Sequence, residues 1–189
     1  RFKDFSPTTT GSFSMSFLAY GTSFKNGDKT FENFLNARAN ISQRQGANNP
    51  FSTNSNVNGS GYAEGYNNPS QDVLIPAFIA AYSGRNSITS TLNTFPKIPK
   101  PNWRITYDGL LKIDTIKKYF KSFTLSNAYN STYAVGGYTT NLLYNGSGDY
   151  TNQKDTISSI IDNPNFITKN LFNTVTIVEQ WSPLVKLDA

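Results

Sequence analysis

The chain has 189 residues and a formal net charge of +5, which suits one globular domain or part of a larger protein. Asn, Ser and Thr together make up 63 residues and aromatic residues 14%, whereas charged residues make up only 15%, a mixture that favours β-structure over helical bundles. Cys and His are both absent, which excludes a disulfide framework and leaves no thiolate or imidazole for metal binding or acid–base chemistry.

The N-terminal third predicts one strand and one helix. The chain opens on Arg1 with neither an initiator Met nor a charged-then-apolar leader, so we expect a processed or excised piece. Residues 11–24 begin with Phe and Met in alternation with Ser, which predicts a strand. Thr30 can cap a helix over residues 31–45, whose apolar side chains fall on one stripe. The Asn-, Ser- and Gly-rich residues 47–70 predict a long loop.

The middle of the chain predicts a buried helix followed by a short strand. Residues 73–83 form the most apolar segment and suit a short buried helix capped by Asp72, although Pro76 makes its first turn irregular. Residues 102–107 alternate strictly between bulky and polar side chains, which predicts a strand with one apolar face. Residues 114–120 can form one or two helical turns.

Residues 122–144 carry the longest strand signal of the chain. The bulky side chains occupy one parity up to Val135 and the other parity beyond Gly136 and Gly137. Because a one-residue slip moves every side chain to the opposite face of a sheet, this change predicts a β-bulge at the glycine pair.

The C-terminal part predicts a loop and a last strand. Residues 145–172 are typical of a loop with a short helix near residues 157–161. Residues 173–187 alternate again and predict a strand, whose apolar face is interrupted by Glu179 and whose end or edge holds Pro183.

Positive charge is concentrated in one segment. Seven cationic and two acidic residues lie between Lys97 and Lys121, so this segment accounts for the whole net charge. The plainer interpretation is a solvated rim; the alternative is a surface that faces anionic headgroups or an acidic partner. The basic rim consists of Lys97, Lys100, Lys112, Lys117, Lys118 and Lys121.

No pattern of residues indicates catalysis. Without His or Cys the usual nucleophile–base pairs are missing, and the Gly-Ser-Gly triplets at 59–61 and 146–148 lack the Lys of a phosphate loop. We therefore expect no enzyme, cofactor or metal. The basic segment and its aromatic residues could bind single-stranded nucleic acid by stacking. Because the same aromatic residues fit a strand face and a helix stripe, we expect no nucleic-acid partner.

The alternating strands fit two architectures. A soluble β-sandwich hides its apolar face against a second sheet, whereas a membrane barrel exposes it to lipid. Long strands, aromatic residues near their ends and polar faces of Ser, Thr and Asn favour lipid, and about 9–11 alternating residues suffice to cross a membrane. The expected lipid-facing or interfacial residues are Trp103, Ile105, Tyr107, Phe123, Leu125, Tyr129, Tyr133, Val135, Val175, Ile177 and Trp181.

Four blocks of the sequence resemble the C-terminal part of the SprA/Sov gliding-motility family, which forms the outer-membrane translocon of the type IX secretion system in Bacteroidetes-type bacteria. The similarity runs from about Phe13 to the end, broken mainly in the two long loops, and departs from the family at Asn127-Ala128, where a His-Gly-like pair is expected. The four blocks are DVLIPAFIAAYSG, FPKIPKPNWRITYDGL, KKYFKSFTLSNAYNSTYAVGGYTTNLLY and VEQWSPLVKLD.

The resemblance implies that residues 1–189 are a single segment of a very large transmembrane antiparallel β-barrel, mainly β, with long loops carrying short α-helices. It implies a protein-conducting pore in the bacterial outer membrane, through which folded cargo with C-terminal signal domains leaves by a lateral gate. The expected partners are outer-membrane lipid, a smaller barrel shuttle protein, a periplasmic plug protein and secreted cargo. The alternative is a secreted or surface β-sandwich module that holds glycans on exposed aromatic side chains.

Overall fold

A computed structural model describes residues 8–19, 27–144 and 163–182 of the chain. The N-terminal half forms β1 (Thr10–Ser16), α1 (Gly27–Asn48), the short 3-10 turn η1 (Val57–Gly59) and α2 (Gln71–Tyr82). The C-terminal half forms β2 (Trp103–Tyr107), the 3-10 turn η2 (Gly109–Lys112), α3 (Asp114–Lys117), β3 (Leu125–Thr140) and β4 (Asn170–Trp181).

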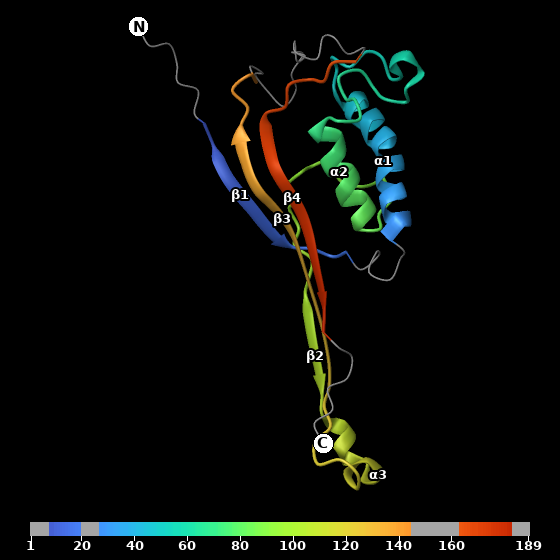
Figure 1. The fold of residues 1–189 in the computed structure, drawn as a ribbon, viewed down its shortest axis with the longest axis vertical. Helices are drawn as coiled ribbons and strands as arrows, with labels where there is room; N and C mark the ends of the chain where they lie inside the picture. The colour runs from blue at the N-terminus through green and yellow to red at the C-terminus, as the bar shows by residue number, and fades with distance from the viewer. Residues whose placement is uncertain (1–7, 20–26, 145–162, 183–189) are drawn as a thin grey trace.

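The described strands form one antiparallel sheet with β3 at its centre (Figure 1). β4 pairs with one edge of β3, from Trp181 opposite Tyr129 to Asn170 opposite Thr140. The other edge of β3 is shared, because β1 pairs with its C-terminal half and β2 with its N-terminal half. The antiparallel sheet was predicted, but this four-stranded sheet is open and the described chain is mixed α/β rather than mainly β.

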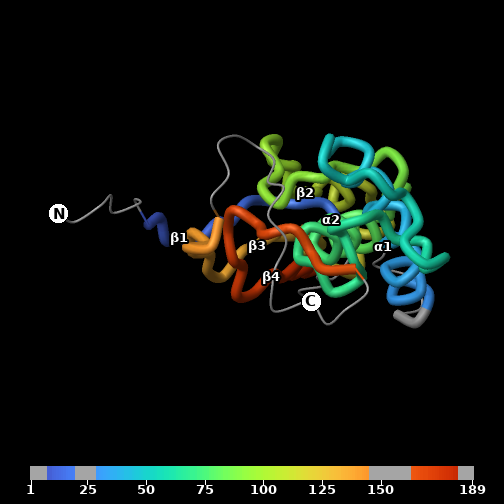
Figure 2. The backbone as a smooth tube through the Cα atoms, turned by 90° about the horizontal axis from the view of Figure 1, so that it is seen from above, coloured from blue at the N-terminus to red at the C-terminus, as the bar shows by residue number. Residues whose placement is uncertain are grey.

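The two long helices lie beside one face of the sheet, and α2 lies between α1 and the strands (Figures 1 and 2). Ala37 and Ile41 of α1 pack against Ala77 of α2. The rest of α1 is predominantly polar, in keeping with a helix that buries one stripe and exposes the remainder. The α1–α2 pair therefore forms a layer whose outer side is polar and exposed to solvent.

Pro76 lies inside α2, where it lacks the N–H group that would bond to the carbonyl of Asp72. The side-chain Nε2 of Gln45 in α1 donates to that carbonyl oxygen at 3.0 Å. A residue from a neighbouring helix thus replaces the missing intrahelical bond, and α2 runs through Pro76 without ending there. Asp72 itself is in the first turn rather than at the predicted cap position, which Ser70 holds.

The core lies between α2 and the upper half of the sheet, which is the half of β3 that pairs with β1. Tyr133 and Val135 of β3 are fully buried there against Ile75 and Ile79 of α2 and Phe17 after β1. The side-chain hydroxyl of Tyr133 is satisfied, since it donates to the carbonyl of Thr94 at 2.8 Å. This core joins α2 to β1, β3 and β4.

The predicted β-bulge is confirmed. The register between β3 and its neighbours shifts between Val135 and Gly137 and again before Tyr138. After the shift Tyr138 packs on the same core as Val135. The bulge therefore keeps the bulky side chains on one face of the sheet although their parity in the sequence changes.

The other predicted elements are present with shifted ends. The helix predicted at 31–45 begins earlier, so that Thr30 lies in its first turn, while the helix predicted at 114–120 is a single short turn. Three predicted pieces lie outside the described residues: 20–24 of the first strand, the helix near 157–161, and 183–187 of the last strand.

Candidate functional site: an exposed arm with a basic tip

The lower half of the sheet projects beyond the helices as a narrow arm (Figure 1). We define the arm as residues 102–129 together with residues 180–182 at the end of β4. Its strands are held by the pairing of β2 with β3 and by a backbone hydrogen bond of 2.8 Å from the N–H of Ser182 to the carbonyl of Ala128. The arm tip, residues 108–124, carries η2 and α3.

An aromatic cluster marks the base of the arm. The ladder places Tyr129 of β3 between Trp103 of β2 and Trp181 of β4. The rings of Trp103 and Tyr129 are stacked with centroids 4.5 Å apart, and those of Tyr129 and Trp181 lie 4.7 Å apart. The Tyr129 hydroxyl accepts the N–H of Ala19 at 2.9 Å and is hydrogen-bonded to Glu179, which gives the carboxylate on this mainly apolar face a partner.

Beyond this cluster the apolar face of the arm is uncovered. Tyr107 pairs with Leu125, and both lie on the same face as Trp103 and Ile105. Ile105 is 62% exposed and Tyr107 52% exposed, because α2 does not reach this far along the sheet. The arm therefore presents apolar side chains that the described part of the chain leaves without cover.

The arm tip combines positive charge with exposed apolar groups. Its lysines are all exposed, and between them lie Ile113, 49% exposed, and Tyr119, 73% exposed. The Nζ of Lys118 lies 5.9 Å from the centroid of the Tyr119 ring. Tyr119 is one of the aromatic residues of the basic segment that the sequence analysis considered for stacking, whereas Ile113 was not singled out, although its position among the lysines is visible in the sequence. The lysines of the tip are Lys112, Lys117, Lys118 and Lys121.

The structure divides the basic rim into two groups. Four of its lysines are at the arm tip, whereas Lys97 and Lys100 border a pocket beside α2. The five residues of β2 separate the two groups and span about 17 Å at ~3.4 Å per residue. The six lysines therefore do not act as one surface.

The expected lipid-facing residues lie on one face of the sheet, but its two halves differ. Those in the upper half contact protein: Tyr133 and Val135 are covered by α2, and Val175 and Ile177 pack around them. Those in the arm are Trp103, Ile105, Tyr107, Leu125, Tyr129 and Trp181, of which Tyr129 is buried in the aromatic cluster. Phe123 precedes β3 and packs edge-to-face on Phe120 at 5.6 Å. Contact with lipid stays a prediction for the arm residues that the chain leaves exposed.

The described residues offer little for metal or redox chemistry. No group of three acidic side chains comes close enough to hold a metal ion within the described ranges. No helix in the described part of the chain is long and apolar enough to cross a membrane.

The chemistry of the arm suits binding. It presents aliphatic and aromatic groups on one face, polar groups on the other, and ammonium groups at its end.

No protein-family model matches this sequence, and no curated protein matches it.

Proposed function

We propose that this chain is a segment of a protein-conducting outer-membrane translocon of the type IX secretion kind, built as a large transmembrane antiparallel β-barrel. The observation that carries the proposal is the uncovered apolar face of the arm, with Ile105 and Tyr107 exposed next to a tip rich in lysine. Hydrocarbon would cover the aliphatic groups, and anionic headgroups would lie against the lysines, which gain about 1 kcal/mol each near such a surface.

The length of β3 supports a sheet that is only partly in the membrane. Its 16 residues exceed the about 9–11 tilted residues that cross the apolar band of an outer-membrane barrel. At least about five residues of β3 would therefore stand in water. The same strand is divided into an upper part covered by α2 and a lower part, residues 125–129, in the arm. We assign the arm to the lipid and the α1–α2 layer, with its polar outer side, to the aqueous phase.

The second face of the sheet suits the lining of a pore. Ser14 of β1 lies opposite Ala134 of β3, which lies opposite Thr176 of β4, and Arg104 and Thr106 continue this face along the arm. These side chains are mostly small, polar and uncharged. Such a lining stays wet and offers a passing protein few apolar or ionic sites to bind.

The unpaired edges of the sheet are places where further strands would pair. Among the described strands β4 pairs only with β3, so its outer edge of 12 residues carries backbone groups without a strand partner. A long exposed edge is a site of aggregation, and a barrel removes it by pairing each edge with the next strand. We propose that strands of the same longer chain pair with β4 and with the outer edge of β1 and β2.

The proposal assigns partners by analogy with the family that the sequence resembles. The barrel would contact outer-membrane lipid, a smaller barrel shuttle protein at a lateral gate, a periplasmic plug protein and cargo with C-terminal signal domains. The described residues carry no feature that selects one of these contacts, so no residue is assigned to them.

Separation of the membranes of the producing cells by density tests the proposal. The protein that contains this chain should sediment with the outer membrane and resist extraction by alkaline carbonate. Its loss should leave proteins with C-terminal signal domains in the periplasm. A protein recovered in the soluble fraction, or normal export without it, would refute the proposal.

The glycan-binding alternative makes the opposite prediction, namely a chain that folds in buffer without detergent and binds glycans. A sugar ring binds on a free aromatic face, but the stacked rings of Trp103 and Tyr129 cover each other on one side. This contact makes the aromatic cluster at the base of the arm a structural one, and it favours the translocon proposal.

A further inference from the structure

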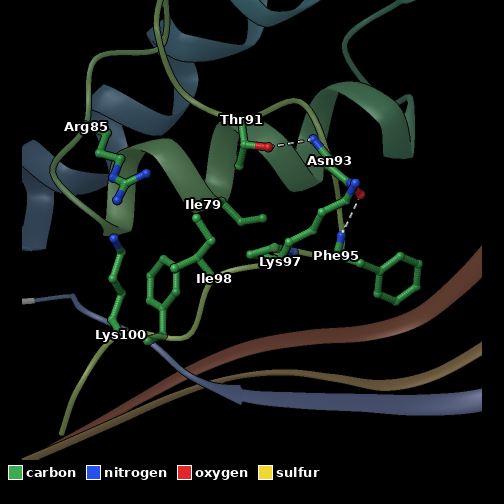
Figure 3. Close-up of a pocket in the computed structure, with 10 residues that line it drawn as sticks. Ile79, Arg85, Thr91, Asn93, Phe95, Lys97, Ile98 and Lys100 are labelled. Atoms are coloured by element: carbon green, nitrogen blue, oxygen red, sulfur yellow. Dashed lines mark hydrogen bonds between the residues drawn. The ribbon is translucent and has the colours of Figure 1, made fainter.

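A pocket of about 320 Å³ opens between the C-terminal end of α2 and the loop of residues 91–100 (Figure 3). This volume lies at the small end of the range for ligand sites, which is about 300–1,000 Å³. The pocket is beside the helix-covered half of the sheet and away from the exposed face of the arm. Its function is therefore independent of the proposed role of the arm.

The floor of the pocket is apolar. Ile79 comes from α2, Phe17 from the segment after β1, and Ile98 from the loop. Ile98 is 70% exposed at the rim and faces Ile79 across the pocket in Figure 3. Ile79 is already buried, so an apolar group bound here would chiefly remove Ile98 from water, which is favourable in proportion to the area covered.

Three cations border the same pocket: Arg85, Lys97 and Lys100. No acidic side chain lines it, and no side-chain hydrogen bond or ion pair joins these cations to another described residue. The charged ends of Arg85 and Lys100 extend toward the same side of the pocket in Figure 3. Like charges that converge repel each other, so an anion between them would be attracted by both and would relieve the repulsion.

Two side-chain oxygens of the loop already accept hydrogen bonds within it. The side-chain oxygen of Thr91 accepts the N–H of Asn93 at 3.1 Å, and the side-chain oxygen of Asn93 accepts the N–H of Phe95 at 2.9 Å. Pro96 has no N–H. A bound peptide would need partners for its own N–H and C=O groups, and these residues supply few. The pocket thus suits a ligand whose only polar group is an anion.

We propose that the pocket binds a free aliphatic carboxylate of medium chain length. The carboxylate would lie between Arg85 and Lys100, and the hydrocarbon chain would lie along Ile79, Ile98 and Phe17. The planar guanidinium of Arg85 can donate two hydrogen bonds to one carboxylate. The volume of the pocket accommodates one short chain and excludes a lipid with two long chains.

Photolabelling of the full-length protein with a decanoic acid that carries a diazirine in its chain tests the proposal. Irradiation should attach the probe to peptides that contain residues 91–100 or Ile79, as read by mass spectrometry. Unlabelled decanoate should compete with this labelling, whereas decanol, which has the same chain without the charge, should compete at least about tenfold less well.

Matched variants separate the pocket from unspecific binding to apolar surface. The double variant Arg85→Gln, Lys100→Gln should raise the decanoate concentration for half-maximal competition by about tenfold or more. The variant Ile98→Glu, which brings a competing carboxylate to the rim, should abolish labelling. The control Lys112→Gln, Lys117→Gln removes the same charge from the arm tip and should leave labelling unchanged.

Three results of the decanoic acid experiments would overturn the proposal. They are equal competition by decanol and decanoate, labelling that the Arg85 and Lys100 substitutions leave intact, and labelling of the arm in place of the pocket. The comparison of decanol with decanoate uses the unaltered protein, so it stays decisive if a variant fails to fold. A phospholipid bearing the same photoreactive group should not label the pocket, and pocket labelling by it would also contradict the proposal.

Discussion

Single residues hold the loop between α1 and α2 in place. The buried side chain of Asn163 accepts the N–H of Gly65 at 2.9 Å and donates to the carbonyl of Ala63 at 3.0 Å. Ser42 of α1 likewise accepts the N–H of Ala63 at 2.9 Å. The loop that the sequence shows only as rich in Asn, Ser and Gly is therefore tied to two distant parts of the chain. Buried polar groups without such partners would each cost about 1–3 kcal/mol.

Gly65 is predicted to be intolerant of a side chain for two reasons. Its φ of +79° lies in the left-handed region, and a methyl group there would overlap the ring of Phe166. Gly61 has a similar φ of +83° but open space around it. Gly61→Ala should therefore lower the free energy of unfolding by about 1–2 kcal/mol, and Gly65→Ala by about 1–3 kcal/mol more. Thermal unfolding of the two variants measures the difference, and equal losses would mean that Phe166 moves aside freely.

Asp72 should make the stability of the chain depend on pH. Burial raises the pKa of this carboxyl from 3.8 to about 6, so the folded state holds the ionised form at a cost. The cost is complete at pH 7, falls as pH is lowered through 6, and is small near pH 4. Asp72→Asn should therefore raise the free energy of unfolding at pH 7 by about 1–3 kcal/mol and give little gain at pH 4.

Thermal unfolding of the Asp72→Asn variant and the unaltered chain at both pH values measures this difference. Lys169 lines the same small pocket as Asp72. A gain of the same size at pH 4 and pH 7 would show that the effect does not come from ionisation.

At the scale of elements, the two faces of β2 test which side of the arm contacts lipid and which contacts water. Ile105 and Thr106 are adjacent, both exposed, and on opposite faces of the strand. If the apolar face lies in hydrocarbon, Ile105→Lys should cost about 2–4 kcal/mol near the bilayer midplane and less near its edges. Thr106→Lys should cost little, because its side chain would face water.

The yield of assembled, heat-modifiable protein in the outer membrane measures the effect of the two substitutions. Ile105→Lys should lower this yield, and Thr106→Lys serves as the matched control of equal charge. Normal assembly of the Ile105 variant together with failure of the Thr106 variant would reverse the assignment of the two faces.

At the scale of the whole molecule, the outer edge of β4 should govern association of the isolated chain. Thr176 and Val178 are exposed residues of this edge strand. Lysine on an edge strand opposes pairing with another copy, so Thr176→Lys, Val178→Lys should reduce aggregation in buffer. Leu142→Lys is the control, since Leu142 is an exposed apolar residue outside the sheet. Light scattering during refolding measures association, and equal effects of both variants would indicate unspecific apolar contact in place of edge pairing.

The sequence by itself determined the local features of this protein. Alternation over residues 102–107 and 122–135 fixed which side chains share a face, because the period of a strand is two. The parity change at Gly136 and Gly137 located the bulge for the same reason. The ends of the helices were less well predicted, since Asp72 and Thr30 are capping residue types that here lie within the first turns.

Only the tertiary structure decided what covers each face. Alternation places Val135 and Ile105 each on the apolar face of its own strand, but it does not show that α2 covers the first and not the second. The separation of Lys100 from the lysines of the tip, and its approach to Arg85 at one pocket, also depend on how distant segments pack. The physical reason is that side-chain periodicity is a property of a few consecutive residues, whereas cover comes from contacts between residues far apart in the chain.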